Sequence, residues 1–442
     1  MTNLERFQHI SVLGAAGKMG CGILLLNVLH NAKMKTLPEF RSKTFVIHAI
    51  DQSFERLNGL NDYLKTQVLK WAEKNIVWLR KIYSDQPHLI DNEDIINAFV
   101  FDALSMVKPS INVESAYQSS LIFEAIIEDV TIKSKILEQI KTNNPYDPWF
   151  LTNTSSIPIH VLNEKANLKG NIIGCHFYNP PAIQRLIEVI ELQNGNSELA
   201  HLVYSFGTQM EKIMVPSNDV AGFIGNGFFM RDILYAEGLL SRLLKNLNHS
   251  EAIVAIDMIT RDLMVRPMGI FQLVDYVGID VCNFIMKVMS VHLKEKLQSP
   301  LLEELMSKGV KGGQNADGSQ KAGIFQYERG VPVAVYNSSS NEYLSLEPIV
   351  KKINDYLATK VNRYSWKQLS RSKQANQLLS DYFRELTKEN SEGARLTIDY
   401  MQAMKKIALT LVEDKVTDSP EHVNTVMKNG FYHVYGPVND FI

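Results

Sequence analysis

A glycine-rich stretch near the N-terminus, LGAAGKMG at residues 13–20, constrains the fold more than any other feature of the sequence. It follows a short apolar run and leads directly into the helical pattern CGILLLNVL. Glycines between a strand and a helix permit a tight turn and a close approach of the backbone to a phosphate, which the helix N-terminus stabilises. The spacing Gly14, Gly17, Gly20 is one residue longer before the middle glycine than the common dinucleotide fingerprint. We expect a βαβ unit whose lengthened turn holds a dinucleotide; a plain tight turn is the alternative for the glycines alone.

An acidic residue ends the next apolar run, at residues 43–51. In dinucleotide-binding folds an acid at this place binds the ribose hydroxyls, and its charge repels the extra phosphate of NADP. Asp51 therefore favours NAD over NADP. The separation from Gly14 is 37 residues (51 − 14), longer than the usual ~20, and we assign the extra length to residues 30–43.

The first half of the chain alternates apolar runs with helical stretches, and the second half does not. Further strands are predicted at residues 120–127, 149–155 and 171–179, which favours a parallel sheet with helices on both faces. A helical region near 53–85 is too long for a simple crossover and predicts an arm or helical hairpin. From about Pro216 long amphipathic runs take over. The predicted fold is an α/β Rossmann-type domain over 1–215, followed by all-α domains.

The helical half contains a weak internal repeat. Asp257 and Gly269 are twelve residues apart (269 − 257), as are Asn424 and Gly436 (436 − 424), and each pair follows a helix-like stretch. Between them, NSSSNEY at 337–343 has the composition of a linker or surface loop. We expect a tandem repeat, with a first helical domain over 216–336 and a second over 340–442. Chance similarity of two amphipathic segments is the alternative.

The bulk composition excludes several classes of protein. With 45% apolar and 21% charged residues and a net charge of −2, the chain has no basic surplus that would indicate nucleic acid or an anionic membrane as partner. The three cysteines are scattered, which indicates a reducing compartment and no metal site. We find neither a signal peptide nor an apolar run of membrane-spanning length. A soluble, cytoplasmic protein is expected.

Polar residues stand at or just beyond the ends of the predicted strands, where ligands of open parallel sheets bind. They are Glu128 and Lys133, then Asn153 and Ser155, then His176, Asn179 and Glu188. Glu188 lies twelve residues after His176 (188 − 176), inside the apolar run LIEVI. If the chain turns at NPPA and returns alongside, the carboxylate meets the second nitrogen of the imidazole. Such a pair fixes the tautomer and raises the basicity of a histidine.

Four stretches together resemble the 3-hydroxyacyl-CoA dehydrogenase family in order and spacing: FEAIIEDVTIKSKIL, NTSSIPI, GCHFYNPPAIQRLIEVI and SNDVAGFIGNGFF. The resemblance implies a Rossmann domain followed by helical domains that close over an acyl-CoA. It implies reversible, NAD-dependent oxidation of a 3-hydroxyacyl-CoA to a 3-oxoacyl-CoA, a step of fatty-acid β-oxidation in lipid metabolism. It also implies a monomer or homodimer, with the second helical copy standing in for a dimer partner.

The resemblance assigns roles to individual residues. His176 matches the catalytic base, and Glu188 matches the acid that orients it. Ser155 and Asn226 match residues that hydrogen-bond the reacting oxygen and the histidine. The residues expected to hold the cofactor are Gly14, Gly17, Lys18, Met19, Gly20, Asp51, Gln52, Glu128, Lys133, Asn153 and Asn179.

Three alternatives stay open at this point. The helical arm is either a CoA-binding element or a plain amphipathic packing helix. The substrate is either an acyl-CoA or a small hydroxy or sugar acid, because gulonate dehydrogenases share these motifs. The third alternative is a non-catalytic scaffold that keeps the fold, against which the complete Ser/His/Glu/Asn set argues.

Overall fold

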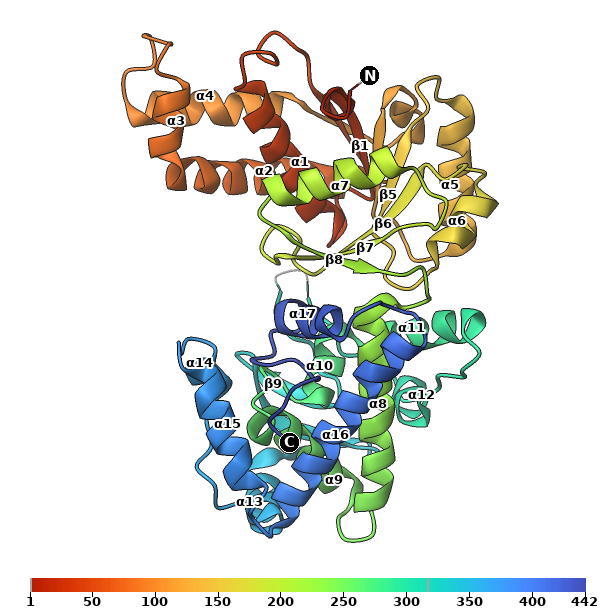
Figure 1. Cartoon of the computed structure of the whole chain (residues 1–442), viewed down its shortest axis with the longest axis vertical. Helices are drawn as coiled ribbons and strands as arrows, with labels where there is room; N and C mark the ends of the chain where they lie inside the picture. The colour runs from red at the N-terminus through yellow and green to blue at the C-terminus, as the bar shows by residue number, and fades with distance from the viewer. Residues whose placement is uncertain (1, 316–317) are drawn as a thin grey trace. The chain divides into compact units, whose positions relative to one another are not determined.

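The computed structural model describes residues 2–315 and 318–442, and the chain divides into two compact units, Met1–Asp219 and Val220–Ile442 (Figure 1). The first unit is built on an eight-stranded sheet in the order β3-β2-β1-β4-β5-β6-β7-β8. The strands are β1 (His9–Leu13), β2 (Val46–Ile50), β3 (Val107–Ser110), β4 (Leu121–Glu124), β5 (Trp149–Thr152), β6 (Ile172–Phe177), β7 (Leu186–Ile190) and β8 (Ile213–Ser217).

The first six strands are parallel and have the order 3-2-1-4-5-6 of the Rossmann fold. The sequence predicts a parallel sheet, and this prediction is wrong for the last two strands. Strand β7 runs antiparallel to β6, and β8 runs parallel to β7. Residues 178–185 join β6 to β7, and so short a connection cannot form the crossover that parallel strands need.

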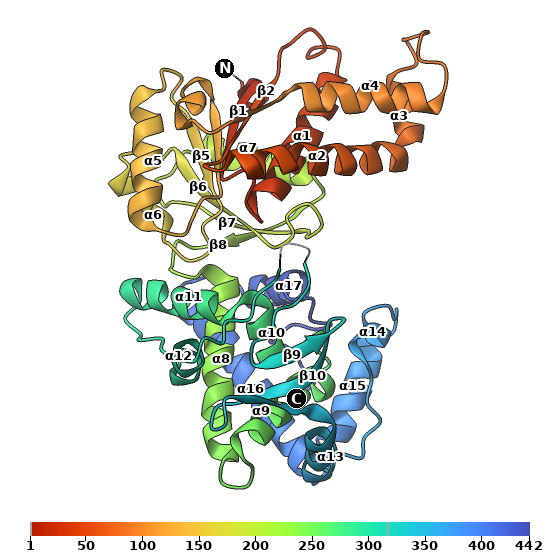
Figure 2. The same ribbon diagram turned by 180° about the vertical axis from the view of Figure 1, so that it is seen from behind.

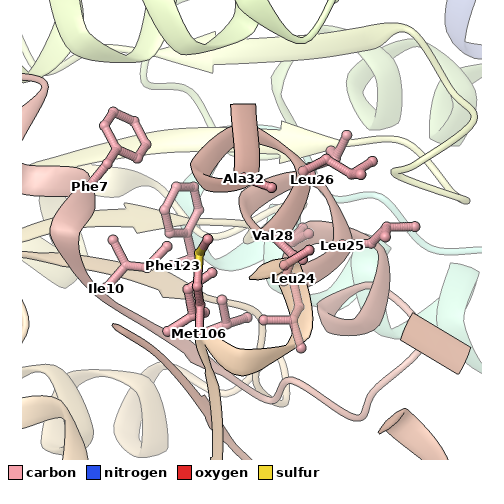
Figure 3. Close-up of a cluster of buried hydrophobic side chains, with 14 of the residues drawn as sticks. Phe7, Ile10, Leu24, Leu25, Leu26, Val28, Ala32, Met106 and Phe123 are labelled. Carbon is pink, nitrogen blue, oxygen red and sulfur yellow. The ribbon is translucent and has the colours of Figure 1, made fainter. Parts of the chain in front are cut away.

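Helix α1 (Gly20–Lys35) forms the centre of the first core. It packs against β1 and β2 on one side and against helices of the arm on another, so that nearly all of it is buried. Figure 3 shows its apolar side chains beside those of Phe7, Ile10, Met106 and Phe123. The remaining helices of the unit are η1 (Glu5–Gln8), η2 (Val113–Gln118), α5 (Val130–Asn143), α6 (Ile159–Lys165) and α7 (Ser197–Gln209).

The predicted helical arm consists of α2 (Phe54–Lys74), α3 (Ile76–Ile82) and α4 (Asn92–Ser105), which extend to one side of the sheet (Figure 2). Leu57, Leu60, Leu64 and Val68 form a buried stripe at helical spacing on α2, which packs on α4. The arm is therefore at least a packing element. Its contact with CoA stays a prediction.

A buried histidine in this core makes the first unit sensitive to acid. His30 on α1 is 1% exposed, and its Nε2 lies 2.9 Å from Gln209 Oε1. Burial lowers the pKa of His30 from 6.5 to about 4. The unfolded chain therefore binds this proton first as the pH falls. Its contribution to stability is fully present above pH ~6.5 and is lost on acidification to pH ~4, to a total of about 3 kcal/mol.

We expect His30→Gln to flatten the loss of unfolding free energy between pH 6.5 and 4, measured by urea denaturation. The exposed His88 provides the control, because His88→Gln removes an exposed imidazole and leaves the buried His30 in place, so its profile should stay as steep as that of the unchanged chain. A His30→Gln profile as steep as that of the unchanged chain contradicts this account of acid sensitivity.

The second unit is mainly helical. Its elements are α8 (Phe223–Leu243), α9 (His249–Met258), the π-turn η3 (Ile259–Leu263), α10 (Ile270–Val277), α11 (Ile279–His292), α12 (Pro300–Ser307), α13 (Leu346–Leu357), α14 (Trp366–Leu369), α15 (Ala375–Leu386), α16 (Glu392–Glu413) and α17 (Pro420–Gly430). It also holds an antiparallel sheet of β9 (Phe325–Glu328), β10 (Val331–Asn337) and β11 (Glu342–Ser345), so the expectation of an all-α unit is wrong in this segment. The stretch expected to be a linker or surface loop supplies the turn between β10 and β11. Among the described residues no helix is long and apolar enough to cross a membrane.

Candidate active site

The glycine loop joins the end of β1 to the start of α1. Gly14 has φ +74°, and a Cβ built on it would lie 2.4 Å from the carbonyl oxygen of Ala125. A Cβ on Gly20 would lie 2.0 Å from the carbonyl oxygen of Gly14. Both positions therefore require glycine, and the turn brings its backbone to the N-terminus of a sixteen-residue helix. Such a turn can bind a pyrophosphate through backbone N–H groups.

Asp51 follows β2 and lies against this loop. Its Oδ2 accepts a hydrogen bond from the Ala16 N–H at 3.2 Å and its Oδ1 accepts one from the Ser53 N–H at 3.1 Å. The carboxylate is thus held at the edge of the glycine loop, as the sequence predicts for a ribose-binding acid. Its role toward a ribose stays a prediction, as do those of the neighbouring Lys18, Met19 and Gln52.

We expect Gly14→Ala to weaken NADH binding at least tenfold. A non-glycine residue at positive φ costs roughly 1–3 kcal/mol, and the added methyl group also meets Ala125. Fluorescence titration with NADH measures the effect. Gly59→Ala on α2 is the matched control, because a Cβ there meets nothing within 4 Å. Equal affinity in the two variants would show that the loop does not contact the cofactor.

A buried ionic cluster lies at the end of β4, the strand that pairs with β1 on the side opposite β2. Glu124 Oε1 accepts hydrogen bonds from Lys133 Nζ at 2.6 Å and from the Ile126 N–H at 2.8 Å, while its Oε2 accepts one from Thr152 Oγ1 at 2.5 Å. Lys133 is 1% exposed and also lies 3.2 Å from Glu128 Oε2. Burial opposes its charge, but the two carboxylates raise the pKa of Lys133 above its ordinary value. The ammonium is therefore fixed and charged.

Glu128 organises the loop that carries Ser155. Its Oε1 accepts hydrogen bonds from Thr154 Oγ1 at 2.6 Å and from the Ser155 N–H at 2.9 Å. Burial would raise the pKa of Glu128, but the charge of Lys133 and these hydrogen bonds hold it below its ordinary value. The cluster thus ties the ends of β4 and β5 together and fixes the backbone of Ser155.

His176 and Glu188 face each other across the antiparallel pair β6 and β7. Their Cα atoms are register partners, and His176 Nδ1 lies 3.0 Å from Glu188 Oε1. The two residues are 8% and 0% exposed. Tyr178 donates a second hydrogen bond, from its hydroxyl to the same Oε1 at 2.7 Å. The chain therefore turns after β6 and returns alongside it as β7, as the sequence suggests.

The loop between β6 and β7 is itself held in place. Lys212 Nζ donates hydrogen bonds to the carbonyl oxygens of Pro181 and Gln184, both at 2.6 Å. Burial, and then the charge of Arg185, lower the pKa of Lys212 to about 8. A Cβ on Gly22 of α1 would lie 2.8 Å from Pro181 Cδ, so this loop packs closely on the helix behind the glycine loop.

The other predicted residues lie in several places. Asn153 accepts a hydrogen bond from the Phe177 N–H at 2.9 Å and so links the end of β5 to that of β6. Asn179 follows β6 in the same loop as Pro181. Asn226 lies in the first turn of α8, in the second unit. Its place beside His176 stays a prediction.

The sequence alone did not identify three residues of this site. Glu124 ends an otherwise apolar strand, which is a signal for a functional acid. Tyr178 stands two residues after His176, on the period that places strand residues on one face. Lys212 is distant in sequence and has no signal beyond its position before an apolar strand.

Two family models match the chain. The NAD-binding domain of 3-hydroxyacyl-CoA dehydrogenase matches residues 9–220, and the C-terminal domain of 3-hydroxyacyl-CoA dehydrogenase matches residues 222–322. A probable 3-hydroxyacyl-CoA dehydrogenase of Caenorhabditis elegans is 31% identical over 226 residues, which cover 50% of this chain and 73% of that relative. A probable 3-hydroxybutyryl-CoA dehydrogenase of Deinococcus radiodurans is 31% identical over 203 residues, which cover 46% and 71% of the two chains.

Solved structures share the fold. The 3-hydroxybutyryl-CoA dehydrogenase of Escherichia coli superposes with a TM-score of 0.63 at 18% identity and covers 98% of this chain and 90% of its own. The enzyme of the same name from Ralstonia eutropha gives a TM-score of 0.54 at 23% identity and covers 73% of this chain and 99% of its own. The fold similarity to the Escherichia coli structure therefore extends past residue 322, where the family models end.

Proposed function

Because this chain belongs to the 3-hydroxyacyl-CoA dehydrogenase family, we propose that it oxidises the 3-hydroxyl group of an acyl-CoA to a ketone, with NAD as the hydride acceptor. The observation that carries the proposal is the buried His176–Glu188 pair, joined at 3.0 Å at the end of β6. A carboxylate behind an imidazole is the arrangement that makes histidine a general base.

The residues present fit a dinucleotide. The loop from Gly14 to Gly20 leaves no room for a Cβ at either end, and Asp51 adjoins it, so Gly14, Gly17, Lys18, Met19 and Gly20 would hold the pyrophosphate. Asp51 and Gln52 would hold the adenosine ribose. The remaining residues proposed for the nicotinamide half are Glu128, Lys133, Asn153 and Asn179. When bound, NAD supplies the acceptor for the hydride that leaves the substrate carbon.

The chain's own residues then handle the proton. The Glu188 carboxylate can only accept a hydrogen bond, so we assign the donor hydrogen to His176 Nδ1, and Nε2 receives the proton of the substrate hydroxyl. Glu188 stabilises the imidazolium that forms. Ser155 would hydrogen-bond the reacting oxygen. Its backbone N–H donates to Glu128 Oε1 at 2.9 Å, which holds the residue in place. The resemblance to the family also assigns Asn226 to this set.

A comparison of thioester and free acid tests the substrate class. The purified chain is given NADH with acetoacetyl-CoA, and in parallel with acetoacetate at equal concentration. We expect turnover of the thioester only. Oxidation of NADH with the free acid alone would favour a small hydroxy-acid dehydrogenase, and NADH binding without turnover of either would favour a scaffold.

We also propose that the helical half contains two copies of one unit. Asp257 Oδ1 accepts from the N–H of Phe271, two residues beyond Gly269, at 3.1 Å. Asn424 Oδ1 accepts from the N–H of Val438, two residues beyond Gly436, at 3.0 Å. A Cβ on either glycine would lie 2.1 Å from an oxygen of its partner side chain. The same contact at the same spacing supports repetition over chance similarity.

The second copy completes the core of the first. The Tyr382 hydroxyl donates to the carbonyl oxygen of Leu263 and the Tyr435 hydroxyl to that of Met264, both at 2.9 Å. These contacts support the proposal that residues 340–442 take the place of a dimer partner.

We also propose that the protein is cytoplasmic, which its three free cysteines support.

A further inference from the structure

Two donors share one oxygen of the carboxylate behind the proposed base. Glu188 Oε1 lies 3.0 Å from His176 Nδ1 and accepts the Tyr178 hydroxyl at 2.7 Å. The two rings also pack together, with their centroids 4.9 Å apart and an angle of 38° between their planes. Tyr178 therefore contacts both members of the pair.

A hydroxyl that donates to a carboxylate oxygen draws negative charge from it, and the same oxygen then stabilises a neighbouring cation less. We propose that Tyr178 is a positioning residue that weakens the hold of Glu188 on protonated His176, and so sets the pH at which His176 gives up its proton. The inference deepens the proposed function, since it concerns the regulation of that same base.

Tyr178 keeps its hydrogen at every working pH. Burial, and then the charge of Glu188, raise the pKa of Tyr178 well above its ordinary value. The phenol is thus a permanent donor and does not itself titrate with the histidine. Its influence on the pair is constant, and it appears only when the hydroxyl is removed.

The elements packed on the pair contribute few other charges. The strands beside it, β5 and β8, carry no ionisable side chain. Helices α6 and α7 pack on β6, and their titratable side chains are exposed or engaged elsewhere: His160 with Asp219, Tyr204 with Glu191, and Glu164, Lys165, Glu198 and His201 toward solvent. Cys175 adjoins the histidine, and burial raises the pKa of its thiol, so it remains neutral. The Glu124–Lys133–Glu128 ionic cluster ties down the Ser155 loop, and Lys212 is engaged with the carbonyl oxygens of the loop between β6 and β7.

The first experiment needs neither substrate nor cofactor. The imidazole titrations of the intact chain and of Tyr178→Phe are followed by NMR with labelled histidine, and the His176 signal is identified by its loss in His176→Gln. We expect the titration midpoint of His176 to move to higher pH in Tyr178→Phe by about 0.5 unit. An unchanged midpoint, or one at lower pH, overturns the inference even if the enzyme is fully active.

The second experiment measures kcat/KM against pH for oxidation of 3-hydroxybutyryl-CoA. The rising limb in Tyr178→Phe is expected at higher pH by the same ~0.5 unit, about a threefold loss at a fixed pH on that limb, with little change on the plateau. Tyr204→Phe is the matched control, because it removes a tyrosine–glutamate hydrogen bond of 3.1 Å in the same unit without touching the pair. A loss in Tyr178→Phe that is equal at all pH values would indicate a purely structural hydroxyl and would contradict the inference.

If the unchanged chain turns over no acyl-CoA, the proposed function fails, whereas the imidazole titration still decides the role of Tyr178. The two failures are therefore distinguishable.

Discussion

Replacing His176 with glutamine lowers kcat for acetoacetyl-CoA reduction by about 10²–10⁴-fold, the usual contribution of a general acid–base group. The reason is that glutamine fills much of the same space and can still contact Glu188, but cannot carry the proton between substrate and solvent. Affinity for NADH stays within about twofold, because the glycine loop and Asp51, which would hold the adenosine half, are unchanged.

The exposed His201 on α7 provides the control for this prediction. His201→Gln removes a histidine from the same unit and leaves kcat unchanged. An activity of His176→Gln within tenfold of the unchanged chain would show that another group moves the proton, and the proposed mechanism would be wrong.

The second large effect is on stability. A buried network in the second unit joins Asp232, Arg266 and Tyr400. Asp232 accepts hydrogen bonds from Arg266 Nη1 at 2.8 Å and from the Tyr400 hydroxyl at 2.6 Å. Burial opposes the charge of the guanidinium, but Asp232 raises the pKa of Arg266 above its ordinary value. Asp232→Asn leaves this cation buried without a counter-charge. We expect a loss of about 3 kcal/mol in the unfolding free energy of this unit.

Hydrogen exchange in increasing urea, followed in peptides from α8 and α16, measures that loss where it occurs. Two controls accompany it. Glu304→Gln breaks an exposed ion pair with Lys308 and costs less than about 1 kcal/mol. The double variant Asp232→Asn, Arg266→Met removes the cation as well and recovers much of the stability. A single variant as stable as Glu304→Gln would mean that the buried charges are hydrated.

Several parts of the fold and site could be predicted because their cause is local. A strand, closely spaced glycines and a helix in that order predict the tight turn found at Gly14. Asp51, at the end of the next strand, lies beside this turn. The pairing of His176 with Glu188 follows from an acid in an apolar run and a turn long enough to reverse the chain but too short for a crossover.

Other parts lack a local signal. Strand β3 is an edge strand that contains Lys108 and Pro109, and β8 contains Pro216, so neither has the composition of a strand. The sheet of β9 to β11 is short, and β10 has an irregular register near Pro332. Glu124 becomes the centre of an ionic cluster only when β4 and β5 are paired, which brings Thr152 to it. Asn226 belongs to the second unit, so sequence could join it to the site only through a family resemblance.

Hydride transfer from an acyl-CoA to NAD is tested most directly by following the hydrogen on C3 of the substrate. 3-Hydroxybutyryl-CoA deuterated at C3 is incubated with the intact chain and NAD, and the reduced cofactor is analysed by mass spectrometry. We expect one deuterium in each NADH formed and acetoacetyl-CoA as the other product. Absence of NADH, or NADH without the label, would contradict hydride transfer from the 3-position of an acyl-CoA.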